Sequence, residues 1–255
     1  MACILLLAIL LGDLPLGAAA GAGGVGWYVK RVGGGAQPTA DPLFSYIEDY
    51  DAYYVDKRHT EAEGDLVLYL TFDAGYENGN VEKILDIMKE ERVSGAFFIL
   101  DNLILRNEGL VRRMAEEGHL VCNHTLRHRD MTKIRDKEAF AHELSALEEL
   151  YRERIGREMP KYYRPPEGKI SKESLAMATE LGYKTILWSF AYADWDNQKQ
   201  PSPDAAVEKI LSKTHNGAVI LLHPTSATNA AILRRLITSW REMGYRFGTL
   251  DELTA

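Results

Sequence analysis

The feature that most constrains the fold is the stretch 66–79, L-V-L-Y-L-T-F-D-A-G-Y-E-N-G, where an apolar strand runs directly into an aspartate and a glycine-containing turn. The seven residues before Asp73 are almost all apolar, β-branched or aromatic, as in a parallel strand buried on both faces. After Asn80, a possible helix cap, Val81, Ile84, Leu85 and Met88 recur with helical spacing. We therefore predict a strand–loop–helix unit with Asp73 at the carboxyl end of its strand, where α/β folds gather reactive side chains.

The alternation of strand and helix continues along the chain. Apolar strands are predicted at 96–100, 120–122, 184–189, 218–222 and 245–250, and helices lie between them. Gly156 is the predicted end of one helix, Ser202 with Pro203 the predicted start of another, and the last helix is predicted over 232–243. About seven such units in one domain predict an α/β fold, a distorted (β/α) barrel of about seven parallel strands. We assign residues 1–26 to a signal-like segment, 27–64 to a linker and short N-terminal arm, and 65–255 to the main domain.

Composition restricts the class of partner. With 46% hydrophobic and 26% charged residues, the chain is typical of a globular protein. A net charge of -7 argues against a nucleic-acid partner, since such proteins usually present a basic face. The two cysteines, Cys3 and Cys122, do not form a disulfide framework. We expect a monomer.

The N-terminal residues predict export. Residues 2–11 are continuously apolar, and a small-residue tract with A-x-A at 18–20 follows. Asp13 interrupts the apolar run short of the ~20 residues that span a bilayer. No Lys or Arg precedes Lys30, which departs from the usual signal pattern. We expect a cleaved signal and a secreted or envelope-associated protein, with an uncleaved tether or a misassigned start as alternatives.

Several predicted strand ends carry a polar residue: Asp73, His124 with His128, Arg164, Asp194 and His223. Each has an ordinary structural interpretation, such as a loop cap, a surface ion pair or a buried core histidine. Two histidines four residues apart can also face one divalent metal, for which neutral imidazole is a suitable ligand. The coincidence of all six at strand ends is the main indication of a site.

In this order, the motifs resemble those of the polysaccharide deacetylase family, the carbohydrate esterases with a NodB-homology domain. The motifs are T-F-D-A-G (71–75), H-T-L-R-H (124–128), R-P-P-E-G (164–168), A-D-W (193–195) and L-L-H (221–223). The resemblance covers roughly residues 66–250. The stretches 50–54, 75–79 and 188–195 are similar to the branch that removes acetyl groups from N-acetylmuramic acid in peptidoglycan, which prepares muramic δ-lactam in spore formers.

The resemblance implies metal-assisted amide hydrolysis by this domain. His124 and His128 would hold a divalent ion, zinc or cobalt. Asp73 would be the general base, oriented by Arg164, and His223 the general acid. Asp194 would belong to the same catalytic set. The implied substrate-binding residues are Trp195, Leu221, Tyr76 and Pro166.

Two positions depart from the family pattern. Ala74 stands where most members have a second aspartate that binds the metal, and Ala191 replaces the first acid of D-x-x-D-W. A glycan-binding protein that has lost catalysis through Ala74 is therefore an alternative. A chitin-oligomer deacetylase is another. A pure binder has no need of a base, its orienting arginine and an acid, so a de-N-acetylase of cell-wall glycan is the favoured interpretation.

Overall fold

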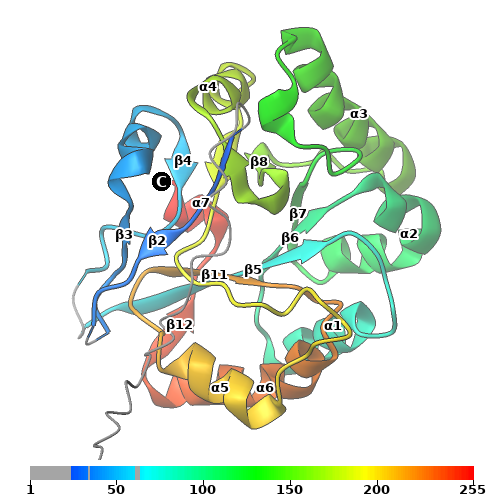
Figure 1. Cartoon of the computed structure of the whole chain (residues 1–255). Helices are drawn as coiled ribbons and strands as arrows, with labels where there is room; N and C mark the ends of the chain where they lie inside the picture. The colour runs from blue at the N-terminus through cyan, green and yellow to red at the C-terminus, as the bar shows by residue number, and fades with distance from the viewer. Residues whose placement is uncertain (1–23, 34, 61–63) are drawn as a thin grey trace, which may run out of the picture.

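A curled parallel sheet forms the centre of the fold in the computed structural model, which describes residues 24–33, 35–60 and 64–255 (Figure 1). The strand order is β11-β5-β6-β7-β8-β10-β4, and β12 also pairs with β5. The strands are β4 (Ala52–Tyr53), β5 (Leu66–Ala74), β6 (Ala96–Ile99), β7 (Leu120–Asn123), β8 (Tyr162–Tyr163), β10 (Lys184–Ile186), β11 (Ala218–Leu222) and β12 (Tyr245–Phe247).

The sheet curls back on itself. Just beyond β10, Phe190 forms a parallel bridge with Ile220 of β11, the strand at the other end of the order. The seven strands along the path are all parallel to their neighbours. The predicted distorted (β/α) barrel is therefore confirmed.

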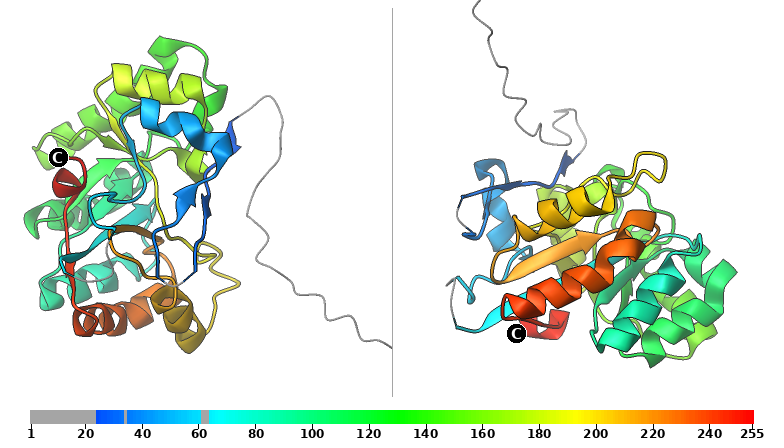
Figure 2. Two further views of the ribbon diagram at one scale, coloured as in Figure 1. Left: turned by 90° about the vertical axis from the view of Figure 1, so that its left-hand side faces the viewer. Right: turned by 90° about the horizontal axis from the view of Figure 1, so that it is seen from below.

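Helices cover the outside of this sheet. They are α1 (Val81–Glu91), α2 (Asp101–Glu116), α3 (Lys137–Ile155), α4 (Lys172–Glu180), α5 (Pro203–Leu211) and α6 (Ala227–Glu242). The short helix α7 (Leu250–Leu253) instead packs Leu250 and Leu253 with Val67 and Tyr69 of β5. Figure 2 shows α5 and α6 side by side next to β11. The predicted signals fix several ends: Ser202 caps α5 ahead of Pro203, and Gly156 ends α3 with a φ of 77°.

One predicted helix cap and one predicted helix start differ from the structure. Asn80 precedes α1 but makes no side-chain capping bond; its Nδ2 instead donates to the carbonyl of Thr225. α6 begins at Ala227 rather than near Ile232, because the Ser226 hydroxyl accepts from the Asn229 N–H and caps the helix. In both cases the hydrogen bond involves a residue of the loop between β11 and α6.

The alternation of β5 divides its side chains between two cores. Leu68, Leu70, Phe72 and Ala74 belong to the large apolar cluster shared with the helices. Val67 and Tyr69 belong to the cluster inside the barrel. Since successive strand residues point to opposite faces, Asp73 follows Tyr69 on the inner face. This register aims the carboxylate at the mouth of the barrel.

The N-terminal arm is integrated into the main domain. β1 (Val25–Gly26) pairs with β9 (Lys169–Ile170), and β2 (Val29–Lys30) pairs with β3 (Thr39–Ala40). The 3-10 helix η1 (Pro42–Asp49) follows, and β4 then joins the edge of the sheet. The predicted helical arm thus packs on the domain, whereas residues 1–23 of the predicted signal lie outside the described residues.

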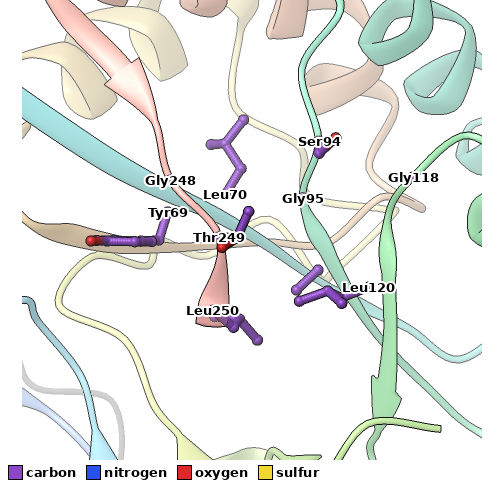
Figure 3. Close-up of a pocket in the computed structure, with 10 residues that line it drawn as sticks. Tyr69, Leu70, Ser94, Gly95, Gly118, Leu120, Gly248, Thr249 and Leu250 are labelled. Carbon is purple, nitrogen blue, oxygen red and sulfur yellow. The ribbon is translucent and has the colours of Figure 1, made fainter. Parts of the chain in front are cut away.

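The barrel end opposite Asp73 is closed by side chains. A small cavity of about 20 Å³ lies there, between β5, the amino ends of β6 and β7, and the segment Gly248–Leu250. Figure 3 shows the residues that line it. That volume is close to what one water needs. Within the described ranges, none of the helices combines the length and apolar character required to span a membrane.

Candidate active site

The register of the sheet brings the predicted site residues together at the carboxyl ends of neighbouring strands. β5 and β11 pair Phe72 with Leu222, so Asp73 and His223 follow at the same level. β7 and β8 pair Asn123 with Tyr163, so His124 and Arg164 likewise follow side by side. The four motifs, distant in sequence, therefore meet at one face of the barrel.

Asp73 is held by a fully buried arginine. Arg164 Nη1 donates to Asp73 Oδ1 at 2.8 Å, and its Nη2 donates to Thr71 Oγ1 at 2.8 Å. Its Nε donates to the carbonyl of Ile186 at 2.9 Å, and the guanidinium lies 4.1 Å from the centroid of the Phe98 ring. The guanidinium is thus fixed on several sides, with one N–H directed at the carboxylate.

The charges around Asp73 keep it ionised. Burial alone would raise its pKa, but Arg164, with contributions from His124 and His223, lowers the pKa below its ordinary value. The side chain is only 10% exposed, and its second oxygen, Oδ2, lies 3.6 Å from His124 Nε2. An ionised carboxylate with one free oxygen is suited to accept a proton.

His124 is oriented by its backbone contacts. Its Nδ1 donates to the carbonyl of Arg164 at 2.8 Å, which leaves Nε2 as the lone-pair nitrogen facing Asp73. Burial lowers the pKa of His124 to about 4, so the ring is neutral near pH 7. The loop that carries it is shaped by Asn123 Oδ1, which accepts from the Thr125 N–H at 2.8 Å.

His128 lies on the open side of this loop. Its ring centroid is 5.0 Å from that of His124, and its backbone N–H donates to Thr125 Oγ1 at 3.0 Å. Thr125 and His128 have φ values of 73° and 54°, a region that non-glycine residues seldom adopt. Such strain is concentrated at functional loops in proteins, which fits the predicted metal-binding role.

The donor set fits a divalent metal only in part. His124 and His128 offer two imidazoles, but across residues 24–33, 35–60 and 64–255 no three His, Cys, Asp or Glu side chains are grouped as a metal site. Ala74 is fully buried in the outer apolar cluster and supplies no oxygen. Catalytic zinc sites usually have three protein ligands, so we expect weak binding.

Metal binding can be tested at position 74. We expect the purified protein to be largely metal-free. Ala74→Asp should lower the melting temperature without metal, because it places a carboxylate in the outer apolar cluster. Zinc should raise the melting temperature more than in the wild type, because binding the ion would draw that carboxylate out of the cluster. Ala74→Asn, which adds an oxygen without charge, is the matched control, and calorimetric zinc titration gives the affinities. Equal zinc affinity in the three proteins would show that position 74 does not reach the ion.

His223 is paired with a buried acid. Its Nδ1 donates to Asp194 Oδ1 at 2.7 Å, and its backbone N–H donates to Asp194 Oδ2 at 2.8 Å. Asn229 Nδ2 donates to the same Oδ2 at 2.6 Å and to the His223 carbonyl at 3.0 Å. Asp194 is fully buried and accepts both hydrogen bonds from His223. Asp194 therefore orients His223 even though Ala191 replaces the first acid of D-x-x-D-W.

The pairing sets the proton affinity of His223. Burial would lower its pKa, but the hydrogen bond and charge of Asp194 raise the pKa above its ordinary value. His223 therefore holds its proton to a pH above ~6.5 and loses it as the pH rises through the raised pKa. We therefore expect kcat to fall at some pH above ~6.5, as His223 loses its proton, which gives the pH profile an alkaline limb.

Replacing the partner should move this limb. Asp194→Asn removes the charge that raises the pKa of His223 and leaves burial as the main influence, so the limb should shift to lower pH. The measurement is kcat against pH, with the His223 ring followed by NMR. An unchanged limb in the variant would mean that another group is the acid.

The predicted substrate-binding residues comprise two exposed aromatics and two buried residues. Trp195 and Tyr76 are exposed, at 54% and 44%, and the Tyr76 hydroxyl accepts from Asn197 Nδ2 at 2.7 Å. This contact joins the loop after β5 to the loop that carries Trp195. Leu221 and Pro166 are buried, two positions before His223 and two positions after Arg164. The two exposed aromatics offer faces on which a sugar ring can pack.

Sequence reasoning missed Thr71 and Asn229. Thr71 accepts from Arg164 and donates to the carbonyl of Ile220, and Asn229 completes the hydrogen bonds of Asp194. The sequence pattern assigned Thr71 only to the buried strand that precedes Asp73. Asn229 could have been found if Ser226 had been recognised as the cap of α6, which places Asn229 in the first helical turn above His223.

Residues 60–186 match the polysaccharide deacetylase family, and with the relatives described next they show that the chain belongs to this family of hydrolases. It is 36% identical over 230 residues to the peptidoglycan-N-acetylmuramic acid deacetylase PdaA of Bacillus subtilis (strain 168), covering 90% of this chain and 85% of PdaA. The PdaA structure, a family 4 carbohydrate esterase, superposes with a TM-score of 0.84 at 35% identity, covering 92% of this chain and 98% of that one.

Other relatives act on a second peptidoglycan sugar. The chain is 34% identical over 184 residues to the peptidoglycan-N-acetylglucosamine deacetylase PgdA of Listeria monocytogenes serotype 1/2a (strain 10403S), covering 72% of this chain and 38% of PgdA. A family 4 carbohydrate esterase from Bacillus anthracis has a TM-score of 0.73 at 32% identity, covering 92% of this chain and 98% of that one. The expected family and enzyme class are therefore confirmed.

Proposed function

We propose that the protein removes the acetyl group from N-acetylmuramic acid residues of peptidoglycan, as a secreted or envelope-associated enzyme assisted by zinc or cobalt. The observation that carries the proposal is the placement of an arginine-held carboxylate, Asp73, and a carboxylate-held imidazole, His223, at the ends of neighbouring strands. One side of the mouth thus offers a base and the other an acid. A δ-lactam-forming role in sporulation follows from the same resemblance.

The residues divide the work of amide hydrolysis. Asp73 accepts a proton from the attacking water as the water oxygen bonds to the carbonyl carbon of the acetyl group. His223, protonated because of Asp194, gives its proton to the nitrogen as the carbon–nitrogen bond breaks, so that acetate and a free amine leave. Arg164 keeps Asp73 ionised and oriented. A metal held by His124 and His128, when bound, would polarise the acetyl carbonyl.

Acetate release from peptide-stripped peptidoglycan tests this function. The wild-type protein should release acetate, a chelator should suppress the release, and added zinc or cobalt should restore it. The same glycan without N-acetyl groups is the control substrate. If glycan binds but no acetate appears with either metal, the alternative of a glycan-binding protein holds. Release from chitin oligomers alone would identify the other alternative, a chitin-oligomer deacetylase.

Two exposed arginines favour the muramic sugar. Arg127 and Arg129 flank His128 and are 67% and 60% exposed; they pair with Asp101 at 3.0 Å and Glu143 at 3.3 Å. Muramic acid carries a lactyl carboxylate next to its acetamide, and N-acetylglucosamine does not. A cation at the rim of the site can recognise that carboxylate.

The preference can be measured with matched glycans. Arg127→Gln/Arg129→Gln should lower kcat/KM about tenfold on N-acetylmuramic acid, which corresponds to the loss of one charged hydrogen bond. Turnover of N-acetylglucosamine in the same glycan should change little. Arg106→Gln/Arg152→Gln is the control for the loss of two surface cations. An equal fall on both sugars would contradict a role in specificity.

A further inference from the structure

Trp27 bridges the two loops that flank Arg164. Its backbone N–H donates to the carbonyl of Gly168, the last residue of R-P-P-E-G, at 2.9 Å. Its indole Nε1 donates to the carbonyl of Trp188 at 2.8 Å. The strand pair β1–β9 continues the first contact through Val25 and Ile170. One residue of the N-terminal arm therefore ties together two segments that are separate in the sequence.

The segment held by the indole is the one that receives the guanidinium. Arg164 Nε donates to the carbonyl of Ile186 at 2.9 Å, and Nη2 lies 3.4 Å from that of Leu187. Trp188 comes next, and its ring lies 5.8 Å from the Arg164 guanidinium. The carbonyl fixed by Trp27 is thus one residue beyond that of Leu187 and two beyond that of Ile186, the two carbonyls that orient Arg164.

The two loops also contact each other closely. Gly168 has a φ of 62°, and a Cβ there would lie 2.4 Å from the Trp188 ring. The ring of Trp27 packs on Phe44 and Tyr54, with both ring centroids 5.0 Å away, and the indole is only 4% exposed. A displacement of either loop would therefore be passed to the other, and the aromatic cluster of the arm resists it.

We propose that Trp27 is a positioning residue for the reaction: its indole N–H fixes the 186–188 segment, and that segment fixes the guanidinium that holds Asp73. The inference rests on the proposed function and extends it to the N-terminal arm. Mutation of a group that holds a metal ligand in place commonly costs about 10- to 100-fold in activity, and we expect an effect at the lower end of this range for Trp27, which acts on Arg164 through the 186–188 segment.

Trp27→Phe tests the indole N–H, because phenylalanine keeps an aromatic ring in the cluster. The matched control is Trp240→Phe, which removes a buried indole N–H that donates to Thr214 Oγ1 at 2.9 Å, far from the site. Both variants should lose similar thermal stability. Only Trp27→Phe should lower kcat, by about tenfold, with KM little changed.

A second readout does not depend on activity. Hydrogen exchange of the Arg164 Nε–H, followed by NMR in the full chain, should be faster in Trp27→Phe and unchanged in Trp240→Phe. Unchanged exchange and kcat in Trp27→Phe, or an equal fall of kcat in both variants, would overturn the positioning role. Absence of acetate release by the wild type would instead overturn the proposed function, and the exchange measurement would still decide the role of Trp27.

Discussion

Asp73→Asn is expected to lower kcat/KM for acetate release by about 10²- to 10⁴-fold, the usual contribution of a general base. The variant should remain folded. Asparagine still offers Oδ1 to Arg164 Nη1, and the guanidinium keeps its contacts with Thr71 and the carbonyl of Ile186. Circular dichroism and acetate release on the same sample measure the two effects.

A second buried aspartate provides the control. Asp56 is 2% exposed, accepts from Arg58 Nε at 2.9 Å and from the Tyr69 hydroxyl at 2.6 Å, and lies near the amino end of β11. Asp56→Asn should cost stability but leave kcat within a few fold. Retention of most turnover by Asp73→Asn, or an equal loss in Asp56→Asn, would refute Asp73 as the base.

Arg164→Met is expected to destabilise the fold by about 3–5 kcal/mol and to remove activity. It leaves the Asp73 carboxylate without its buried counter-charge, and the Thr71 hydroxyl and the Ile186 carbonyl lose their donor. Urea unfolding at neutral pH gives the free energy of unfolding.

The matched surface change is Arg112→Met. Arg112 also donates to a carboxylate, Glu108, and to the carbonyl of Ile155, but it is 41% exposed. Its loss should cost no more than about 1 kcal/mol. A similar loss of unfolding free energy in the two variants would show that the buried Arg164–Asp73 pair stabilises the fold no more than an exposed pair does.

Much of the fold could be predicted because the signals are local. The strand that ends at Asp73 has an unbroken apolar pattern, and Gly156 and the Ser202–Pro203 pair end or begin helices by their own backbone preferences. The short strands were harder. β8 contains only Tyr162–Tyr163, and β4 only Ala52–Tyr53, so neither shows a period, and their place is set by pairing with β10.

The sequence motifs predicted which residues form the candidate site, but not all of the side chains that hold those residues in place. Asp73, Arg164 and His223 lie at strand ends, where polar residues stand out against apolar runs. The partner of Asp194 is Asn229, thirty-five positions away in the sequence, and the indole of Trp27 reaches Trp188 across 161 positions. Such contacts depend on how the barrel curls, which no local pattern encodes.

The topology of β5 also determines when the barrel can form during synthesis. β5 pairs with β6 soon after it, but its other neighbours are β11 and β12, where Leu68 pairs with Ala218, 150 residues later, and Leu66 pairs with Tyr245, 179 residues later. Contacts so distant in sequence form slowly and late. A ribosome must therefore make the chain as far as β12 before the central strand has all its partners. The export that we propose for this chain would benefit from such a delay, because a secretion channel threads chains that have not yet folded.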